Sequence, residues 1–148
     1  MTTLDARLNT YSPVVLSLFR VVFGFLFTLF GTAHVFDWPI VFGVSTGSWP
    51  VWWAGVIELV TGLLIMVGLF TRIAAFIASG HMAVAYFWQH QPHALWPIVP
   101  PEMGGNGGLS AILFCFAFFL LVFTGPGSIA VDSVLGRGRT AAAGGTGR

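Results

Sequence analysis

The stretch Pro13–Val35, PVVLSLFRVVFGFLFTLFGTAHV, decides the fold because it is long and apolar enough to cross a membrane. A helix needs about 20 mostly apolar residues to cross roughly 30 Å of hydrocarbon. One arginine, Arg20, interrupts the stretch. Three more apolar segments follow, at about 49–70, 71–89 and 108–124. Together they predict an all-α protein, an integral membrane four-helix bundle.

The composition of the whole chain supports a membrane protein. Apolar residues make up 56% of the 148 residues and charged residues 7%, against roughly 45–50% and 25% in soluble domains. So few charges cannot cover the surface that a small soluble domain exposes to water. The net charge of +1 offers no basic surface to neutralise nucleic-acid phosphates. We therefore exclude a soluble domain, a disordered tail and a nucleic-acid binder.

The arginines outside the apolar segments predict the orientation. If the chain crosses four times, Arg7, Arg72 and the arginines after residue 136 share one side, and the two long loops opposite carry no Lys or Arg. Positively charged loops are typically cytoplasmic, so we expect both termini in the cytoplasm of a multi-pass inner-membrane protein. The predicted organisation is a short cytoplasmic N-terminus (1–12), a four-span domain (13–125) and a cytoplasmic tail (126–148) that is flexible after about 137.

Pro13 is predicted to lie in the first turn of the first helix. A first-turn residue has no helical partner for its N–H, so proline is tolerated there. Ser12 then precedes the helix as a candidate N-cap.

Three ionisable residues, Arg20, Glu58 and His81, lie within the predicted spans. Each costs roughly 2.5–3.5 kcal/mol in hydrocarbon, so we expect each to be paired or functional. At 1.5 Å per residue they lie roughly 10, 18 and 13 Å from the cytoplasmic side. Each shares a helix face with small residues, which mark close helix packing. We therefore predict one polar cluster inside the bundle.

Two interpretations of this cluster remain open. In the structural one, Arg20 and Glu58 form an ion pair that fixes helix register, with His81 hydrogen-bonded nearby. In the functional one, the cluster handles protons or a polar head group such as a quinone carbonyl, with Glu58 tuning the pKa of His81.

A second group of candidates lies near the outer face of the membrane. His34, His90 and His93 could supply three imidazoles to a metal. Pro92 prevents a regular helix between the last two, and no Cys or carboxylate completes the ligand set. Solvated interfacial histidines are the alternative, and we expect no metal. Asn106, in a glycine-rich stretch, is a candidate cap for the fourth helix.

The order of these features resembles a known family. Its motifs are matched here by Arg20, Gly31 with His34, Glu58 with Gly62, Gly68–Arg72 (GLFTR), Asn106, and Thr124–Gly127 (TGPG) with Asp132. Over about residues 12–137 this pattern resembles the DoxX family of small four-helix membrane proteins.

The resemblance implies a protein of the bacterial plasma membrane. The family name derives from a subunit associated with thiosulfate:quinone oxidoreductase. A mycobacterial member is linked to a membrane complex with superoxide dismutase and a thiosulfate sulfurtransferase, in thiol and oxidative-stress defence. Arginine without lysine is compatible with an actinobacterial source.

The first functional hypothesis is a membrane redox subunit that binds a quinone near Arg20, Glu58 and His81. It would need a soluble partner enzyme, because the chain shows no ligand set for haem or an iron–sulfur cluster. The alternatives are a non-catalytic anchor that recruits soluble enzymes to the membrane, and a small transporter, which would have to be a homo-oligomer. Membrane lipids are partners in each case.

Overall fold

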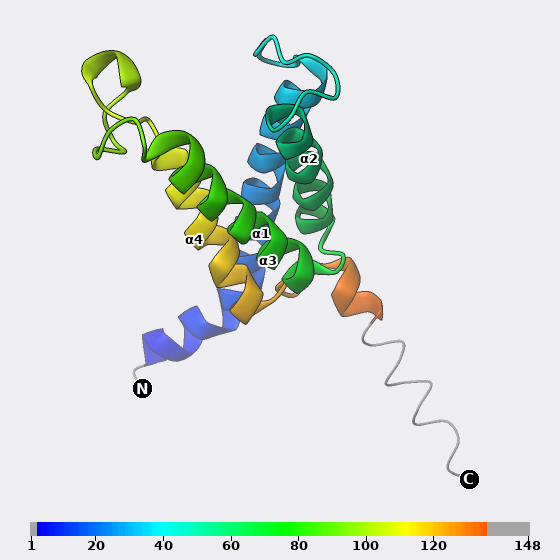
Figure 1. Ribbon diagram of the computed structural model, residues 1–148. Helices are drawn as coiled ribbons and strands as arrows, with labels where there is room; N and C mark the ends of the chain where they lie inside the picture. Colours follow the sequence, from blue (N-terminus) through cyan, green and yellow to red (C-terminus); the bar gives the residue numbers. More distant parts are fainter. Residues whose placement is uncertain (1–2, 136–148) are drawn as a thin grey trace.

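The computed structural model describes residues 3–135, and every regular element in that range is a helix. The main elements are α1 (Thr3–Phe36), α2 (Val51–Val67), α3 (Thr71–Ala85) and α4 (Leu109–Thr124), shown in Figure 1. A π-helical turn, η1 (Tyr86–His90), continues α3, and a short 3-10 helix, η2 (Pro101–Met103), precedes α4. The all-helical class is therefore confirmed. The predicted flexible tail after residue 137 lies outside the described residues.

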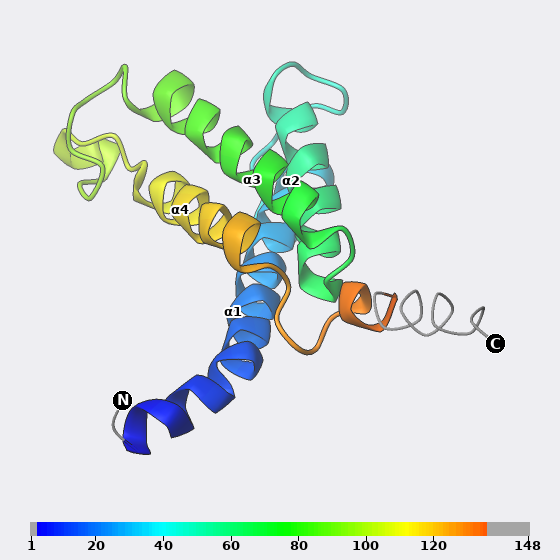
Figure 2. The same ribbon diagram turned by 90° about the horizontal axis from the view of Figure 1, so that it is seen from below.

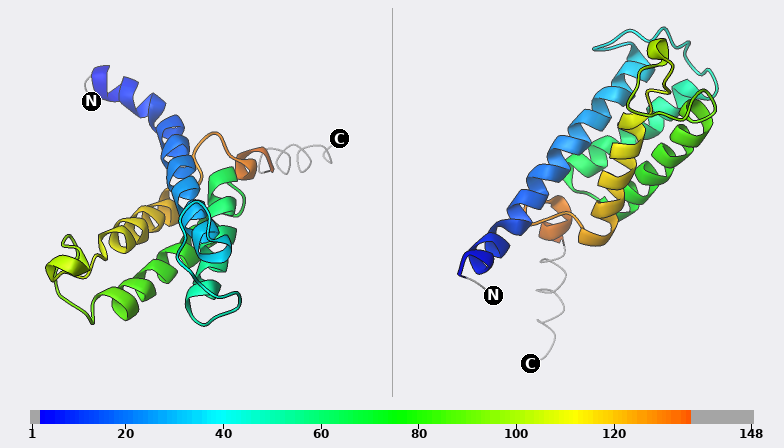
Figure 3. Two further views of the ribbon diagram at one scale, coloured as in Figure 1. Left: turned by 90° about the horizontal axis from the view of Figure 1, so that it is seen from above. Right: turned by 90° about the vertical axis from the view of Figure 1, so that its left-hand side faces the viewer.

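The helices form two pairs. α1 packs along α2 and α3 along α4, and the pairs meet at the α2–α3 turn and diverge toward the two long loops (Figure 1). Both long loops lie at one end of the molecule, and the N-terminus and the segment after α4 lie at the other (Figure 3). We call this second end the base. A wedge between the two helix pairs thus opens away from the base.

The surface of the helices is apolar. By length and composition α1 could cross a membrane, and α2 and α4 are apolar but shorter. Large hydrophobic side chains are exposed on all four α-helices, among them Leu18, Val60, Phe76 and Phe116. An exposed apolar surface of this extent is unusual in a soluble monomer. It is what a protein surrounded by lipid requires.

The structure corrects the predicted start of the first helix. α1 begins at Thr3, so Pro13 is an internal residue and Ser12 is not an N-cap. The Ser12 hydroxyl instead donates to the carbonyl oxygen of Leu8 within the helix. Because proline has no N–H, one helical hydrogen bond is missing, and α1 bends in its N-terminal part (Figure 2). A first-turn proline and a kink proline look alike in a sequence.

Glycines set the distance between α1 and α2. A Cβ atom on Gly31 would lie 2.3 Å from the backbone nitrogen of Leu59, and one on Gly62 would lie 2.6 Å from Oγ1 of Thr28. Real Cβ contacts are never that short, so the two backbones touch where the sequence has no side chain. The predicted close packing along these small-residue faces is confirmed.

The segment after α4 folds back and caps α3. The Asp132 carboxylate accepts hydrogen bonds from the N–H groups of Phe70 and Thr71, at 2.8 and 2.9 Å, and from the Thr71 hydroxyl at 2.9 Å. The Asp132 N–H donates to the carbonyl oxygen of Gly68. Residues 126–135 were predicted to belong to the tail. They instead form part of the base, packed against the start of α3.

These contacts determine the pKa of Asp132. Burial acts to raise it, but the hydrogen bonds from Thr71 and Phe70 and the nearby charge of Arg20 outweigh burial and hold the pKa below its ordinary value. A carboxyl group whose pKa is lower in the folded state stabilises the fold above its unfolded pKa. That stabilisation is lost as the pH falls through the folded pKa.

We predict that Asp132→Asn lowers the free energy of unfolding by about 1 kcal/mol at neutral pH, because asparagine keeps one of the two acceptor oxygens and loses the negative charge. The difference from the unmodified protein should shrink below about pH 4, where the carboxyl group begins to protonate. Unfolding of both proteins in detergent at pH 7 and pH 3 measures this. An equal difference at the two pH values would show that the charge of Asp132 has no part in the cap.

Candidate functional site

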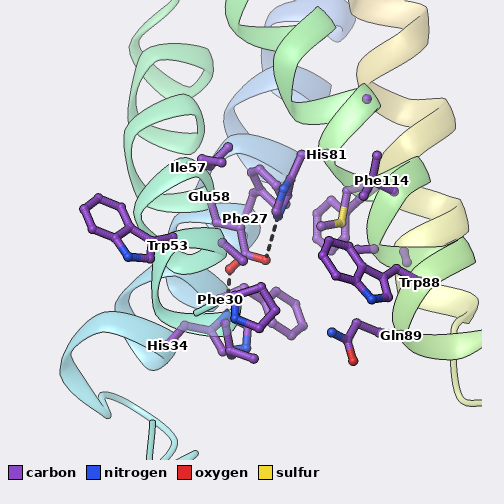
Figure 4. Close-up of a pocket in the computed structure, with 18 of the residues that line it drawn as sticks. Phe27, Phe30, His34, Trp53, Ile57, Glu58, His81, Trp88, Gln89 and Phe114 are labelled. Carbon is purple, nitrogen blue, oxygen red and sulfur yellow. Dashed lines mark hydrogen bonds and ion pairs between the residues drawn. The ribbon is translucent and has the colours of Figure 1, made fainter. Parts of the chain in front are cut away.

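A cavity of about 680 Å³ lies between the two helix pairs. Its walls are largely aromatic and aliphatic, and they include Phe27, Phe30, Trp53, Trp88 and Phe114 (Figure 4). It extends to the loop ends of α2 and α3. Ligand sites in proteins are typically apolar cavities of about 300–1,000 Å³ with a few convergent polar groups. This cavity has that size and that lining.

The polar groups in the cavity converge on one carboxylate. Glu58 of α2 lies between His34 of α1 and His81 of α3 (Figure 4). Its Oε2 is 2.7 Å from Nδ1 of His34, and its Oε1 is 3.5 Å from Nε2 of His81. The side chains of His34, Glu58 and His81 are 20%, 6% and 14% exposed. We call these three residues the His–Glu–His cluster.

Close helix packing brings His34 to Glu58. A Cβ atom on Gly55, one turn before Glu58, would lie 2.5 Å from the Cβ of His34. A larger residue at position 55 would move the two helices apart. An ionised carboxylate only accepts hydrogen bonds, so His34 donates through Nδ1. On the loop side, the ring of Phe42 stacks on His34 with centroids 4.7 Å apart.

The structure corrects the prediction for the outer histidines. His34 points into the cavity and contacts Glu58, whereas His90 lines that cavity only at its loop end and His93 does not line it. Nδ1 of His90 is 2.8 Å from the carbonyl oxygen of Asn106, and His93 is exposed. Within residues 3–135 no group of three or more His, Cys, Asp or Glu side chains is placed to hold a metal. One feature of the sequence does predict that His34 points into the bundle: it shares a helix face with Gly24, Phe27 and Gly31.

Asn106 organises the loop before α4 rather than capping the helix. α4 begins at Leu109, and Gly108 occupies the N-cap position. The buried Asn106 side chain accepts from the N–H of Gly108 and donates to the carbonyl oxygen of Ala94, both at 2.8 Å. Together with the contact to His90, these bonds hold the loop against η1.

Arg20 is not part of the cluster, and the predicted contact with Glu58 does not form. Arg20 is 1% exposed. Its guanidinium donates to the carbonyl oxygens of Ile65 and Met66 in the last turn of α2, and to those of Pro126 and Ile129 after α4. Carbonyls at a helix C-terminus lack helical partners and carry partial negative charge. They satisfy a buried cation as a carboxylate would.

Tightly packed side chains separate Arg20 from the cluster. Phe27, Ile65, Phe118 and Leu121 are almost completely buried and belong to one hydrophobic core. Phe27 lies between Arg20 and His34 along α1, and its ring is 6.5 Å from that of His81. The buried ionisable groups of the bundle therefore form two centres, one at the base and one in the cavity.

Comparison with known proteins identifies the family. The family model for DoxX matches residues 15–91. The chain belongs to the DoxX family. An uncharacterized protein of Haemophilus influenzae is 39% identical over 133 residues, which cover 86% of this chain and 95% of the relative. No solved structure matches. All three residues of the His–Glu–His cluster, and Arg20, lie within the part that matches DoxX. The actinobacterial source of the protein stays a prediction.

We predict that Arg20→Ala destabilises the DoxX protein severely, because it removes a completely buried side chain and its hydrogen bonds to four carbonyl groups, of which that of Ile65 also accepts from the N–H of Gly68. Each carbonyl left without a donor where water cannot reach it costs about 1–3 kcal/mol. Arg72→Ala is the matched control, since the exposed Arg72 donates to a single carbonyl, that of Val122. Unfolding in detergent should show a loss of at least about 3 kcal/mol for Arg20→Ala and less than about 1 kcal/mol for the control. Similar stability of the two variants would refute the role given to Arg20.

Proposed function

We propose that this DoxX-family protein is a membrane redox subunit that binds the head group of a quinone-type carrier at the His–Glu–His cluster. It exchanges protons with the head group and works with a partner enzyme. The observation that carries the proposal is a buried carboxylate held between two imidazoles at the wall of an aromatic cavity.

The donor and acceptor groups of the cluster fit such a head group. A quinone presents two carbonyl acceptors, and its reduced form presents two hydroxyl donors. Nε2 of His81 is buried without a hydrogen-bond partner, since 3.5 Å to Glu58 is long for a hydrogen bond. It is available to donate to a carbonyl, and the Glu58 carboxylate is available to accept from a hydroxyl. Aromatic walls suit a planar ring.

A bound quinone would supply two-electron chemistry coupled to protons. The role of the chain's own residues is to orient the head group and to hold or pass a proton between Glu58 and the two imidazoles. The single Cys cannot ligate an iron–sulfur cluster. Electrons would therefore come from or go to a soluble partner. The family resemblance suggests a superoxide dismutase or a sulfurtransferase for that role.

We place the protein in the bacterial plasma membrane, crossing it several times, with the base on the cytoplasmic side. The apolar exposed surface of the four helices supports this. So does the position of the arginines. Arg7 and Arg72 lie toward the base, and neither loop at the cavity end carries Lys or Arg. The cavity would then open toward the outer half of the membrane.

We predict that Glu58→Gln weakens binding of menadiol, the reduced form of a naphthoquinone without a tail, by at least about tenfold, because a hydroxyl of menadiol loses its hydrogen bond to a charged acceptor, which contributes about 1.5–3 kcal/mol. Quenching of tryptophan fluorescence reports binding, since Trp53 and Trp88 line the cavity. The control is Glu102→Gln in η2, which does not line it. Equal affinity of the two variants, or no saturable binding by the unmodified protein, would rule out the proposed site.

A further inference from the structure

We infer that the cavity opens sideways into the bilayer between α2 and α3, and that its ligand carries a long apolar tail that lies in this opening. The inference rests on the proposed function, because it takes the His–Glu–His cluster as the place of the head group. It adds the class of ligand, a lipid-dissolved quinone rather than a small water-soluble one, and the route by which the ligand enters.

The side between α1 and α4 is closed at the depth of the cluster. Three phenylalanines of α1 pack on Phe114 of α4, with ring centroids 5.9, 5.3 and 5.8 Å away for Phe23, Phe27 and Phe30. Phe27 also contacts Phe118, with centroids 4.7 Å apart. Phe114 and Phe27 are buried. At the level of the buried Phe27 and Phe114 this layer of rings leaves no route for a tail, whereas Phe30, nearer the loops, lines the cavity and is 38% exposed.

The side between α2 and α3 is open at the same depth. Five cavity-lining side chains on this side are 38–56% exposed, and we call them the portal residues: Trp53, Ile57, Ile77, Val84 and Trp88. Each lines the cavity and is also reached from outside, as the rim of an opening must be. In Figure 4, Trp53 and Trp88 lie on opposite sides of the His–Glu–His cluster.

The chemistry of the rim matches a hydrocarbon chain. All five portal residues are aromatic or aliphatic, whereas the polar lining residues outside the cluster, Gln89, His90 and Ser110, lie at the loop end. Tryptophan marks the membrane interface. Glu58 is five residues beyond Trp53 along α2, which at 1.5 Å per residue is roughly 7 Å deeper. A head group at the cluster would therefore lie below the interface, where a ligand dissolved in the bilayer arrives from the side.

The occupant is the tail of the quinone rather than the acyl chain of a phospholipid. A phospholipid would bring a phosphate to the rim, and the rim has no cation to receive it. From residue 21 to residue 135 Arg72 is the sole Arg or Lys, and it lies at the start of α3, at the base. Of the two histidines at the loop end, His90 is engaged with Asn106 and His93 does not line the cavity. The opening thus accepts a chain without a phosphate.

The test compares two quinones that share a naphthoquinone head, menadione without a tail and menaquinone with one, in nanodiscs. The portal variant Ile57→Phe/Val84→Phe narrows the opening from both sides. The control variant Val60→Phe/Ile73→Phe adds the same bulk at exposed positions of α2 and α3 that do not line the cavity. Tryptophan quenching at equilibrium gives the affinity of each quinone for the unmodified protein and for the two variants. If the portal variant does not fold, Val84→Phe alone gives the same comparison.

We expect the portal variant to weaken menaquinone binding by about tenfold or more and to leave menadione binding nearly unchanged, and the control variant to change neither. If menadiol binding depends on Glu58 but the portal variant binds menaquinone normally, the opening is refuted and the proposed function stands. If neither quinone binds the unmodified protein, the proposed function fails and this inference with it. A co-purifying phospholipid that menaquinone does not displace would also overturn it.

Discussion

A carboxylate buried in an apolar bundle needs partners, and Glu58 finds them on two other helices. An isolated buried charge costs several kcal/mol, so the contacts with His34 and His81 constrain how α1, α2 and α3 can be arranged. The glycines between α1 and α2 allow the first contact, because any side chain at Gly31 or Gly55 would separate the helices. The second contact reaches across the wedge between the helix pairs. The cavity therefore lies beside a carboxylate that is hydrogen-bonded to His34 on one wall and lies 3.5 Å from the imidazole of His81 on the other.

The two polar centres of the bundle differ in how completely they are satisfied. At the base, Arg20 has four carbonyl partners, and Asp132 accepts three hydrogen bonds. A fully satisfied network fixes one arrangement, so the base joins α1, the α2–α3 turn and the segment after α4. In the cavity, Nε2 of His81 has no partner. A buried polar atom without a partner calls for an explanation, and a ligand that completes the hydrogen bond is the one we propose.

Hydropathy was enough to predict the helices, and the small-residue faces were enough to predict which sides pack. The separation of Arg20, at the base, from Glu58 and His81, in the cavity, could not be predicted. Counting residues gives the depth of Arg20 and Glu58 but not what lies between them, and the backbone carbonyls that satisfy Arg20 leave no trace in the sequence. His34 was on the correct face, yet its place near the predicted helix end suggested solvent. The hydrogen bond from Ser128 to the carbonyl oxygen of Pro13 and the capping of α3 by Asp132 join segments far apart in the chain, and the sequence does not show which segments meet.

The arrangement around Glu58 is open to direct measurement. Among the residues of the chain, Glu58 and Glu102 are the two glutamates, and there are four histidines. Solid-state NMR on protein with ¹³C-labelled glutamate and with ¹⁵N-labelled histidine and arginine in lipid bilayers would therefore be well resolved. Our account predicts a glutamate carboxyl carbon close to imidazole nitrogens of two histidines, and loss of both couplings in Glu58→Gln. A Glu58 carboxyl carbon that couples to an arginine guanidinium and to no imidazole would contradict it.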